Sequence, residues 1–357
     1  MRVLWLSHRD VFHPLRGGAE RTIYEIARHL VKRGHEVVWF SVAPIGPPPP
    51  KEIEGIHLVR SEGNLSSHLS VPWTIRQAQP DVVVEDLAHV LPWTPDWLTR
   101  CPVTAFFRHL HSRTLPGQVG PIERTLLINV ESRYSWIFRR SPFVTESNQS
   151  VSDLIRLGID RKRISRIPPG VDLKLFQPRE KTVAPSLVYF SGFKDYKRPH
   201  IALEVLYSIL CNFPDAQLTF IGTGPNLDRV KSLVAPAFRQ SVKFKGRIPD
   251  EEVAATVARS WVHVYPTQAE GWGYCALEAA AAATPTVAFH VPGPSEVVVS
   301  GETGKLVPDG DVDAMSRACA ELLTNRRDFP DKCRRYAAGF TWAKCANSWE
   351  RHLLDLQ

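Results

Sequence analysis

Short runs of β-branched and aromatic residues alternate with helical patterns along this chain, and that alternation restricts its fold more than any other feature. "RVLWLS" (residues 2–7) is followed by a glycine-containing loop and by "RTIYEIARHLVKRG" (21–34), whose apolar residues recur at helical spacing. Further strand-like runs are "HEVVWFSV", "DVVVED", "PVTAFF" and "PFVTES". Strands that alternate with helices predict an α/β fold, with parallel sheets covered by helices on both faces.

The alternation occurs in two series. A proline-rich stretch without periodicity, residues 163–186, separates them and is the best candidate for a linker. Six more short strands follow it, from "LVYFSG" to "GKLVPDG", and an amphipathic helix, "TWAKCANSWERHLLDLQ", comes after the last strand. With 357 residues, the chain is long enough for two domains of ordinary size.

Composition restricts the class of protein. Hydrophobic residues make up 43% of the chain and charged residues 23%, as in soluble globular proteins. No stretch approaches the roughly 20 apolar residues of a membrane span, and the short apolar run in "MRVLWLSHRD" suits a first strand better than a signal peptide. We therefore expect a cytoplasmic protein whose six scattered cysteines are buried free thiols.

The formal charge of +7 lies mostly in the N-terminal half, where residues 1–176 carry 23 lysines and arginines against 17 acidic residues. Such a surface suits phosphate groups or an anionic membrane. No recognition helix or zinc-finger pattern accompanies these basic residues, so nucleic acid is not an expected partner.

Glycines follow two of the predicted strands. Gly17 and Gly18 in "RGGAER" open the first helix, whose N-terminal N–H groups favour phosphate. Gly222 and Gly224 in "IGTGPN" follow a later strand but lack the third glycine of a dinucleotide fingerprint, which disfavours a nicotinamide cofactor.

Charged residues also follow strands, at the sheet edge where α/β proteins bind ligands. "FSGFKDYKRP" supplies cations that can neutralise a diphosphate leaving group, namely Lys194, Lys197 and Arg198. "FFRHLHSR" supplies Arg108, His109 and His111, and a histidine there can bond to a sugar hydroxyl or relay a proton. Asp309, Asp311 and Asp313 precede a helical pattern, so we interpret them as helix caps rather than metal ligands.

These loops occur in an order that resembles a retaining glycosyltransferase of family GT4, over nearly the whole chain. The matching segments are "GGAER", "GVD", "DYKRP", "FIGTGP", "VKFKGRI", "EGWGYCALEAAAAATPTVAF", "VPGPSEVV" and "GETGKLVPDGD". The most specific is the E-x7-E element, Glu270 to Glu278. The resemblance implies the GT-B architecture, with two Rossmann-like domains facing a central cleft: residues 1–170 on the acceptor side and 171–340 on the donor side. It also implies that the last helix, 341–357, crosses back to the first domain.

The resemblance implies roles for individual residues. Glu270 contacts the donor sugar, Glu278 contacts the ribose hydroxyls, and Lys197 pairs with the diphosphate. Gly17 and Gly18 close over the phosphates from the other domain. The remaining donor-binding candidates are Gly271, Trp272 and Gly273 with their backbone, Tyr274 at the start of a helix, Arg247 and Ile248 near the base, and Lys194, Arg198, Gly222 and Gly224.

The chain departs from the family at three positions. Gly192 stands where an arginine is usual, and Lys194 is the candidate substitute for that cation. The family histidine aligns with Arg108, which leaves His109 or His111 to assume its role. Ala283 replaces a glycine, a change that we expect to affect packing rather than activity.

We therefore expect a metal-independent, retaining glycosyltransferase that needs no cofactor. A UDP- or GDP-sugar is its co-substrate, and a glycan, glycolipid or lipid-linked molecule is the acceptor. Lys197 and helix N–H groups can stabilise the departing diphosphate without a metal ion. Two alternatives stay open: a GT-B epimerase that acts on the nucleotide sugar, and a degenerate GT-B subunit that binds a partner without catalysis.

The basic, aromatic stretch "IERTLLINVESRYSWIFRRSP" (122–142) fits two interpretations. It can rest on an anionic membrane, at the inner membrane face, while a lipid-linked acceptor enters the site. It can also be an ordinary amphipathic helix with a stripe that faces the core, which is the interpretation we favour.

Overall fold

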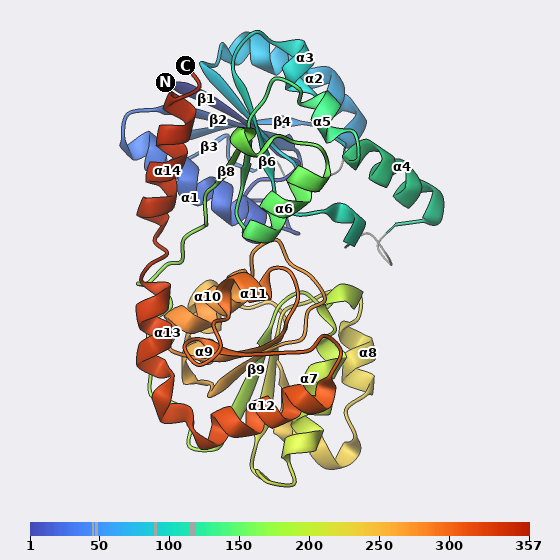
Figure 1. Ribbon diagram of the computed structural model, residues 1–357, viewed down its shortest axis with the longest axis vertical. Helices are drawn as coiled ribbons and strands as arrows, with labels where there is room; N and C mark the ends of the chain where they lie inside the picture. The colour runs from blue at the N-terminus through green and yellow to red at the C-terminus, as the bar shows by residue number, and fades with distance from the viewer. Residues whose placement is uncertain (45, 47–48, 89–90, 114–118) are drawn as a thin grey trace. The chain divides into compact units, whose positions relative to one another are not determined.

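The computed structural model describes residues 1–44, 46, 49–88, 91–113 and 119–357. They form two compact units, Met1–Gly170 with Trp342–Gln357, and Val171–Thr341 (Figure 1). Each unit holds one mostly parallel sheet with helices packed against it. The expected α/β fold with two Rossmann-like domains is therefore confirmed.

The sheet of the first unit has eight strands in the order β3-β4-β2-β1-β5-β6-β7-β8. Neighbouring strands are parallel except for the antiparallel pair β3 and β4. At the centre, Val3 of β1 lies between Val37 of β2 and Val82 of β5. The strands are Arg2–Leu6 (β1), Glu36–Val42 (β2), Glu52–Ile53 (β3), Ile56–Ser61 (β4), Val82–Asp86 (β5), Val103–Phe107 (β6), Phe143–Thr145 (β7) and Ile164–Arg166 (β8).

Two helices cover one face of this sheet, α1 (Gly18–Lys32) and α14 (Trp342–Leu354). Trp349 of α14 is fully buried, with its ring centroid 5.1 Å from that of Trp5 and 4.8 Å from that of Phe106. Glu350 of the same helix accepts a hydrogen bond from Arg33 just beyond α1 and pairs with His35. The C-terminal helix therefore belongs to the core of the first unit, although its sequence follows the second.

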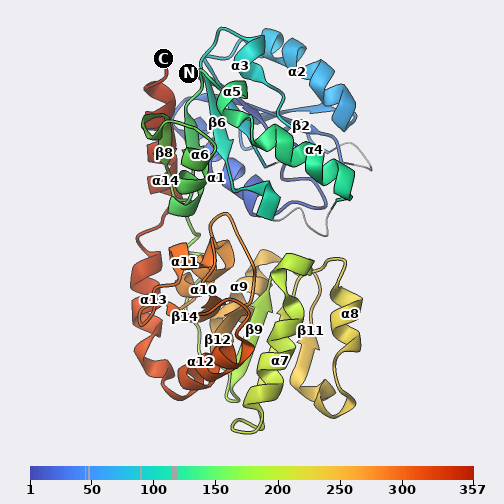
Figure 2. The same ribbon diagram turned by 45° about the vertical axis from the view of Figure 1, so that its right-hand side comes forward.

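The other face of the sheet also carries helices (Figure 2). Their apolar residues pack on alternate residues of β5 and β6. Val83, Leu87 and Val103 point to this side, because side chains alternate along a strand. The helices of this region are α2 (Asn64–Ala78), α3 (Pro95–Leu98), α4 (Pro121–Glu131), α5 (Tyr134–Ile137) and α6 (Asn148–Arg156).

The sheet of the second unit is fully parallel, in the order β11-β10-β9-β12-β13-β14. Its strands are Ser186–Phe190 (β9), Gln217–Ile221 (β10), Val242–Phe244 (β11), Val262–Tyr265 (β12), Thr286–Phe289 (β13) and Gly304–Val307 (β14). Its helices are α7 (Pro199–Ile209), α8 (Leu227–Ser232), α9 (Asp250–Arg259), α10 (Tyr274–Ala281), α11 (Pro294–Val297), α12 (Val312–Thr324) and α13 (Pro330–Ala337). The strand order reverses between β9 and β12, and doubly wound sheets bind ligands beyond the carboxyl ends of the strands at such a reversal.

Some elements have no clear signal in the sequence. The β4 segment has no strong strand pattern of its own. α2 contains Pro72, which disfavours a helix. β8 falls inside the stretch interpreted as a linker, and that interpretation is wrong for its first residues because β8 pairs with β7. All six cysteines are free, as expected, but the expected burial is wrong for Cys211, which is exposed, and Cys101 and Cys275 are half-buried. In the part of the chain that the structure describes, no helix is both long and apolar enough to cross a membrane.

Candidate functional site

Lys197 and Glu270 form an ion pair at the carboxyl ends of two adjacent strands, β9 and β12. Lys197 ends a short 3-10 helix, Asp195–Lys197, in the loop after β9, and Glu270 lies in the loop after β12. The side chains are 13% and 16% exposed, so a ligand can reach both. This pair therefore lies where the strand order reverses, which is the expected ligand position for this fold.

Neighbouring groups fix the Glu270 carboxylate. Thr267 Oγ1 lies 3.2 Å from Glu270 Oε1, and the phenol of Tyr265 hydrogen-bonds to the same carboxylate. Burial and then the charge of Glu270 raise the pKa of Tyr265 well above its ordinary value, so this phenol keeps its proton. Burial is the largest single influence on Lys197 and lowers its pKa, but the charge and hydrogen bond of Glu270, together with smaller contributions from other neighbours, outweigh burial and raise it. Lys197 is therefore a permanent cation.

The "EGWG" turn depends on two glycines in the left-handed region. Gly273 has φ +109° and caps α10, and Gly293 has φ +91° in the opposing loop. A Cβ atom on Gly293 would lie 2.3 Å from Cβ of Glu270, so no other residue fits there. The Glu270 N–H donates to the carbonyl of Pro292 at 2.9 Å, which locks the two loops together. The position of Glu270 is therefore set by backbone packing.

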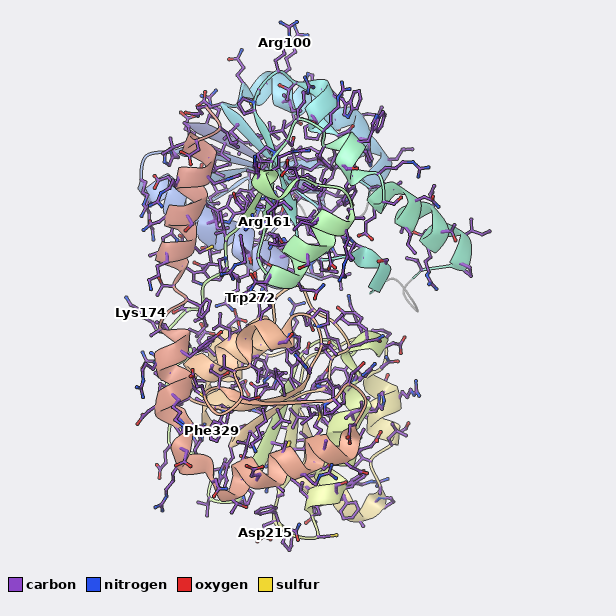
Figure 3. The ribbon with its side chains drawn as sticks, in the orientation of Figure 1. Arg100, Arg161, Lys174, Asp215, Trp272 and Phe329 are labelled. Carbon is purple, nitrogen blue, oxygen red and sulfur yellow. The ribbon has the colours of Figure 1, made fainter. Side chains whose placement is uncertain are left out.

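The other residues of this element have different surroundings. Trp272 (Figure 3) is 2% exposed, and its ring packs 5.7 Å from Phe340, so its side chain belongs to the core. Gly271, Tyr274 and Glu278 are half-buried. Helix α10 begins at Tyr274, as predicted, and Glu278 lies one turn inside it.

The remaining cations of the β9 loop differ in exposure. Lys194 is exposed, with Nζ 5.9 Å from the Tyr196 ring centroid. Arg198 donates to Asp309 Oδ1 at 2.5 Å, so Asp309 pairs with an arginine, and its interpretation as a helix cap is wrong. Asp311 accepts from the Ala314 N–H at 2.7 Å and caps α12, as expected for an aspartate before a helix.

Gly222 and Gly224 hold the loop after β10 against the loop after β9. Their φ angles are +126° and +155°, and added Cβ atoms would lie 2.1 Å from the Ser191 carbonyl and 2.7 Å from the Phe193 carbonyl. Arg247 is exposed, while Ile248 is half-buried against the core. At Gly192, by contrast, an added Cβ would meet only Thr223 O at 3.8 Å, so a side chain is sterically allowed.

In the first unit, Gly17 and Gly18 are exposed at the start of α1. The Gly17 N–H donates to Glu20 Oε2 at 2.7 Å, and Thr22 Oγ1 donates to the Gly18 carbonyl at 2.8 Å. A carboxylate therefore already lies at this helix start, where the fold favours anions.

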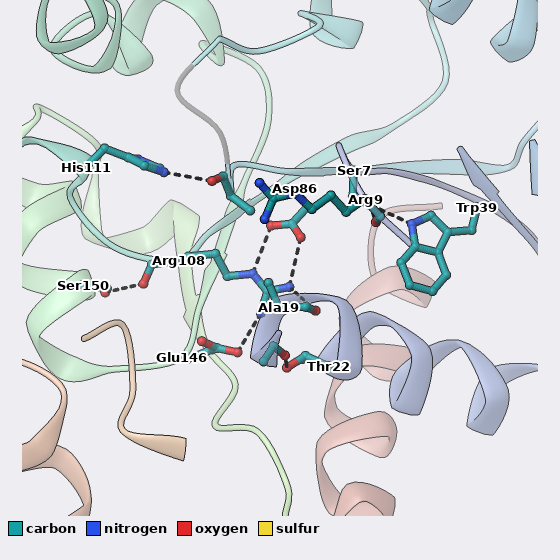
Figure 4. Close-up of polar contacts among 12 residues, drawn as sticks. Ser7, Arg9, Ala19, Thr22, Trp39, Asp86, Arg108, His111, Glu146 and Ser150 are labelled. Carbon is teal, nitrogen blue, oxygen red and sulfur yellow. Dashed lines mark hydrogen bonds and ion pairs between the residues drawn. The ribbon is translucent and has the colours of Figure 1, made fainter. Parts of the chain in front are cut away.

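The "FFRHLHSR" segment contains side chains with different degrees of burial (Figure 4). Arg108 is 4% exposed and bonds to Asp86 and Glu146. His111 is 6% exposed, and its Nε2 lies 3.1 Å from the Ala88 carbonyl, to which it donates. Its backbone N–H donates to Glu131 Oε1 at 2.7 Å. His109 is half-buried, with its ring 4.9 Å from that of His111.

Sequence reasoning missed the partners of these residues. Asp86 is the last residue of β5 and Glu146 directly follows β7, so the sheet-edge rule that selected Arg108 applied to them as well. Tyr265 and Thr267 gave no signal, because a tyrosine at a strand end and a threonine in a loop are common. Among the described residues, no group of three or more histidine, cysteine or acidic side chains can hold a metal ion.

Comparison with known proteins identifies the chain. Residues 172–340 match the family of glycosyl transferases group 1, and residues 16–175 match Glycosyltransferase Family 4. Glycogen synthase from Mycobacterium tuberculosis (strain CDC 1551 / Oshkosh) is 24% identical over 371 residues, covering 93% of this chain and 89% of the relative. The chain is a GT-B glycosyltransferase of the GT4 type. A further relative of this glycosyltransferase is the GDP-mannose-dependent alpha-(1-6)-phosphatidylinositol monomannoside mannosyltransferase of Mycolicibacterium smegmatis, 30% identical over 183 residues (46% of this chain, 48% of the relative).

Solved structures have the same fold as this glycosyltransferase. Sucrose-phosphate synthase from Thermosynechococcus elongatus superposes with a TM-score of 0.84 at 20% identity, over 99% of this chain and 98% of that one. Anabaena Alr3699/HepE in complex with UDP-glucose superposes with a TM-score of 0.79 at 17% identity, over the whole of both chains.

Proposed function

We propose that this glycosyltransferase is a retaining, metal-independent enzyme that transfers a hexose from a UDP- or GDP-sugar to a glycan, glycolipid or lipid-linked acceptor. The observation that carries the proposal is the accessible Lys197–Glu270 pair at the strand-order reversal of the second unit. The UDP-glucose bound to Alr3699/HepE and the GDP-mannose dependence of the Mycolicibacterium smegmatis relative support a nucleotide-sugar donor.

In this proposal each part of the donor contacts particular residues. Lys197 pairs with the diphosphate, Glu270 hydrogen-bonds to the sugar, and Glu278 to the ribose. The base lies near Arg247 and Ile248. The remaining contacts come from backbone or charged groups around the phosphates, contributed by Gly17, Gly18, Lys194, Arg198, Gly222, Gly224, Gly271, Trp272, Gly273 and Tyr274.

The chemistry needs no enzyme nucleophile. The bond from the sugar's anomeric carbon to the phosphate oxygen breaks, and the acceptor oxygen bonds to that carbon on the same face. The acceptor's proton moves to the leaving phosphate. Lys197, held as a cation by Glu270, stabilises the charge that develops on that phosphate, so the step needs no metal ion. His109 or His111 orients the acceptor.

A turnover assay tests this proposal. Incubation with UDP-, GDP- and ADP-sugars and a lipid and glycan extract should release nucleoside diphosphate, equally with and without EDTA, and NMR should find the anomeric configuration retained. An inverted product or loss of activity in EDTA would contradict it. Conversion of the donor into another nucleotide sugar without acceptor would identify an epimerase. Full biological activity of K197A and E270A would identify a non-catalytic subunit.

We further propose that the first unit contacts an anionic membrane at the inner membrane face. Large apolar side chains are exposed on four helices of one face of the sheet. They are Leu65 (82%), Leu69 (78%) and Trp73 (60%) on α2, Trp97 and Leu98 (43% each) on α3, Ile122 (88%) and Leu126 (58%) on α4, and Trp136 (61%) on α5. We call these eight residues the apolar surface.

Charge near the apolar surface favours anionic lipid. Arg139 Cζ lies 4.6 Å from the Trp97 ring, whose centroid is 5.0 Å from that of Trp136. Exposed arginines on or beside these helices are Arg76, Arg100 (Figure 3), Arg124, Arg133, Arg139 and Arg140. Among the described residues, Glu123 is the exposed acid on the four helices, and Glu62 and Asp81 are exposed beside α2, so exposed arginines outnumber exposed acids. Tryptophans with basic neighbours are typical of peripheral membrane contact.

Liposome co-sedimentation tests this contact. Wild-type protein should sediment with vesicles that contain phosphatidylglycerol and not with neutral vesicles, and binding should weaken in salt. The triple variant L69S/W73S/I122S should lose binding. The matched control V183S removes a fully exposed apolar residue from the second unit and should bind as wild type does. Equal binding by the triple variant would contradict the proposal.

A further inference from the structure

The guanidinium of Arg108 joins three strand ends to the first turn of α1 (Figure 4). Its Nε and Nη2 donate to the two oxygens of Asp86, the last residue of β5, both at 3.0 Å. Its Nη1 donates to Glu146 Oε1, after β7, at 2.9 Å, and Nη2 also donates to the Ala19 carbonyl at 3.2 Å. Ser150 Oγ of α6 donates to the Arg108 carbonyl at 3.0 Å. One residue therefore ties five elements together.

The geometry of this contact requires arginine. A guanidinium is a rigid, planar fork that can bind one carboxylate through two atoms while it donates elsewhere, and an ammonium group cannot do this. The Arg108 Cζ also lies 3.7 Å from the centroid of the Phe106 ring, which fixes the plane of the fork. The fork is therefore oriented by its own strand before it reaches α1.

The Ala19 carbonyl is the point where the fork meets α1. Ala19 directly follows Gly17 and Gly18, the exposed glycines at the helix start. Because Arg108 is 4% exposed, it cannot offer its charge to a ligand as an exposed cation does. Arg108 can therefore affect a ligand only through the position of the α1 backbone to which it is hydrogen-bonded.

We propose that Arg108 is a positioning residue that fixes the first turn of α1, and with it the backbone of Gly17 and Gly18, for the phosphates of the donor, which would take the place of the Glu20 carboxylate on the Gly17 N–H. The inference rests on the proposed function, because it takes the nucleotide sugar as the ligand of these glycines. Small displacements of such groups weaken binding strongly, since their hydrogen bonds depend on distance and direction.

Arg108→Lys is the direct test, with Arg163→Lys as the matched control. Arg163 donates to the backbone carbonyls of Phe138 and Ser141, at the opposite edge of the same sheet. Amide exchange at residues 21–23 should be about tenfold faster in R108K and unchanged in R163K, because exchange reports local opening. Asp86→Asn removes the charge of one of the two carboxylates that pair with Arg108. It serves as the second variant if R108K does not fold, and its effect on amide exchange should be intermediate.

Steady-state kinetics tests the link to the donor. R108K should raise KM for the nucleotide sugar about tenfold with kcat within about threefold, while R163K leaves both unchanged. Unchanged amide exchange in both R108K and D86N would overturn the positioning role. Faster exchange with an unchanged KM would overturn the link to the donor. If wild-type protein binds no nucleotide sugar, the proposed function fails, and the exchange data still decide whether Arg108 holds α1.

Discussion

The carboxyl edges of the two sheets hold ion pairs of different construction. In the second unit, Lys197 and Glu270 pair one to one, with side chains 13% and 16% exposed. In the first unit, the single cation Arg108 meets two carboxylates, Asp86 and Glu146, and these side chains are 5%, 1% and 3% exposed. The fold brings charged residues to both edges, because strand ends are where its loops begin.

This difference in exposure distinguishes an ion pair that can bind a ligand from a buried cluster that stabilises the fold. An accessible pair can exchange one partner for a ligand, since solvent and ligand both reach it. A buried cluster cannot do so without leaving a charge unpaired, which is costly in a low-dielectric interior. We therefore assign ligand chemistry to the pair in the second unit and structural support to the cluster in the first.

The largest expected effect comes from Arg108→Met. The variant leaves two buried carboxylates without their cation, so the free energy of unfolding should fall by about 3–5 kcal/mol. Urea unfolding measures this change. Arg156→Met is the control, because Arg156 pairs at 3.6 Å with Asp153 but is itself 71% exposed, and it should change stability by less than about 1 kcal/mol. An R108M variant as stable as wild type would contradict the assignment of a stabilising role to the buried Arg108 cluster.

Lys197→Met should show the opposite pattern. Loss of a cation at the leaving group should lower kcat/KM by about 100- to 1000-fold. Stability should fall by less than in R108M, because only one carboxylate, and a less deeply buried one, loses its cation. Donor-dependent release of nucleoside diphosphate measures the effect. Lys174→Met removes an exposed lysine of the same unit and should leave kcat/KM unchanged. Near-normal turnover by K197M would contradict the assignment.

A third test uses the pH dependence of the first unit. Burial raises the pKa of Glu85, at the end of β5, to about 8, although the Trp93 N–H donates to Oε1 at 2.5 Å. Between about pH 4.5 and 8 the unfolded chain releases this proton and the folded chain keeps it, so the free energy of unfolding should fall as pH rises, by the order of a few kcal/mol. Below pH 4.5 both states are protonated, and no cost arises.

Glu85→Gln isolates this contribution. Urea unfolding at pH 5, 7 and 8.5 should give a smaller pH dependence for E85Q than for wild type, with the variant more stable at pH 8.5. Parallel pH profiles for the two proteins would mean that Glu85 ionises normally in the folded state.

The smallest expected effect concerns the helix that carries Glu278. Ala283 has φ 57°, a left-handed conformation just after α10, where glycine is favoured. Ala283→Gly should therefore raise the free energy of unfolding by about 1 kcal/mol and leave turnover unchanged, because the residue lies beyond the ligand loops. Thermal unfolding measures the gain. Lower stability, or altered donor KM, would contradict a purely conformational role.

Much of the fold was predictable from the sequence, since every strand of the second unit coincides with an apolar run followed by a loop. β4, β8 and α2 were not predictable. They are stabilised by strand pairing and helix packing, which no local sequence pattern encodes. The start of α10 at Tyr274 was predictable from the glycine turn. The Arg108 cluster was not, because its members lie at the carboxyl ends of three separate strands, and only the sheet brings them together.

The most direct test of the central claim is donor binding to the second unit's ion pair. Isothermal titration of wild-type, K197M and K174M proteins with UDP-, GDP- and ADP-sugars would measure it. We expect at least one nucleotide sugar to bind wild type and K174M equally, and K197M to bind it at least about 100-fold more weakly, a difference of about 2.7 kcal/mol. Failure of every sugar to bind wild type, or equal binding by K197M, would contradict the account.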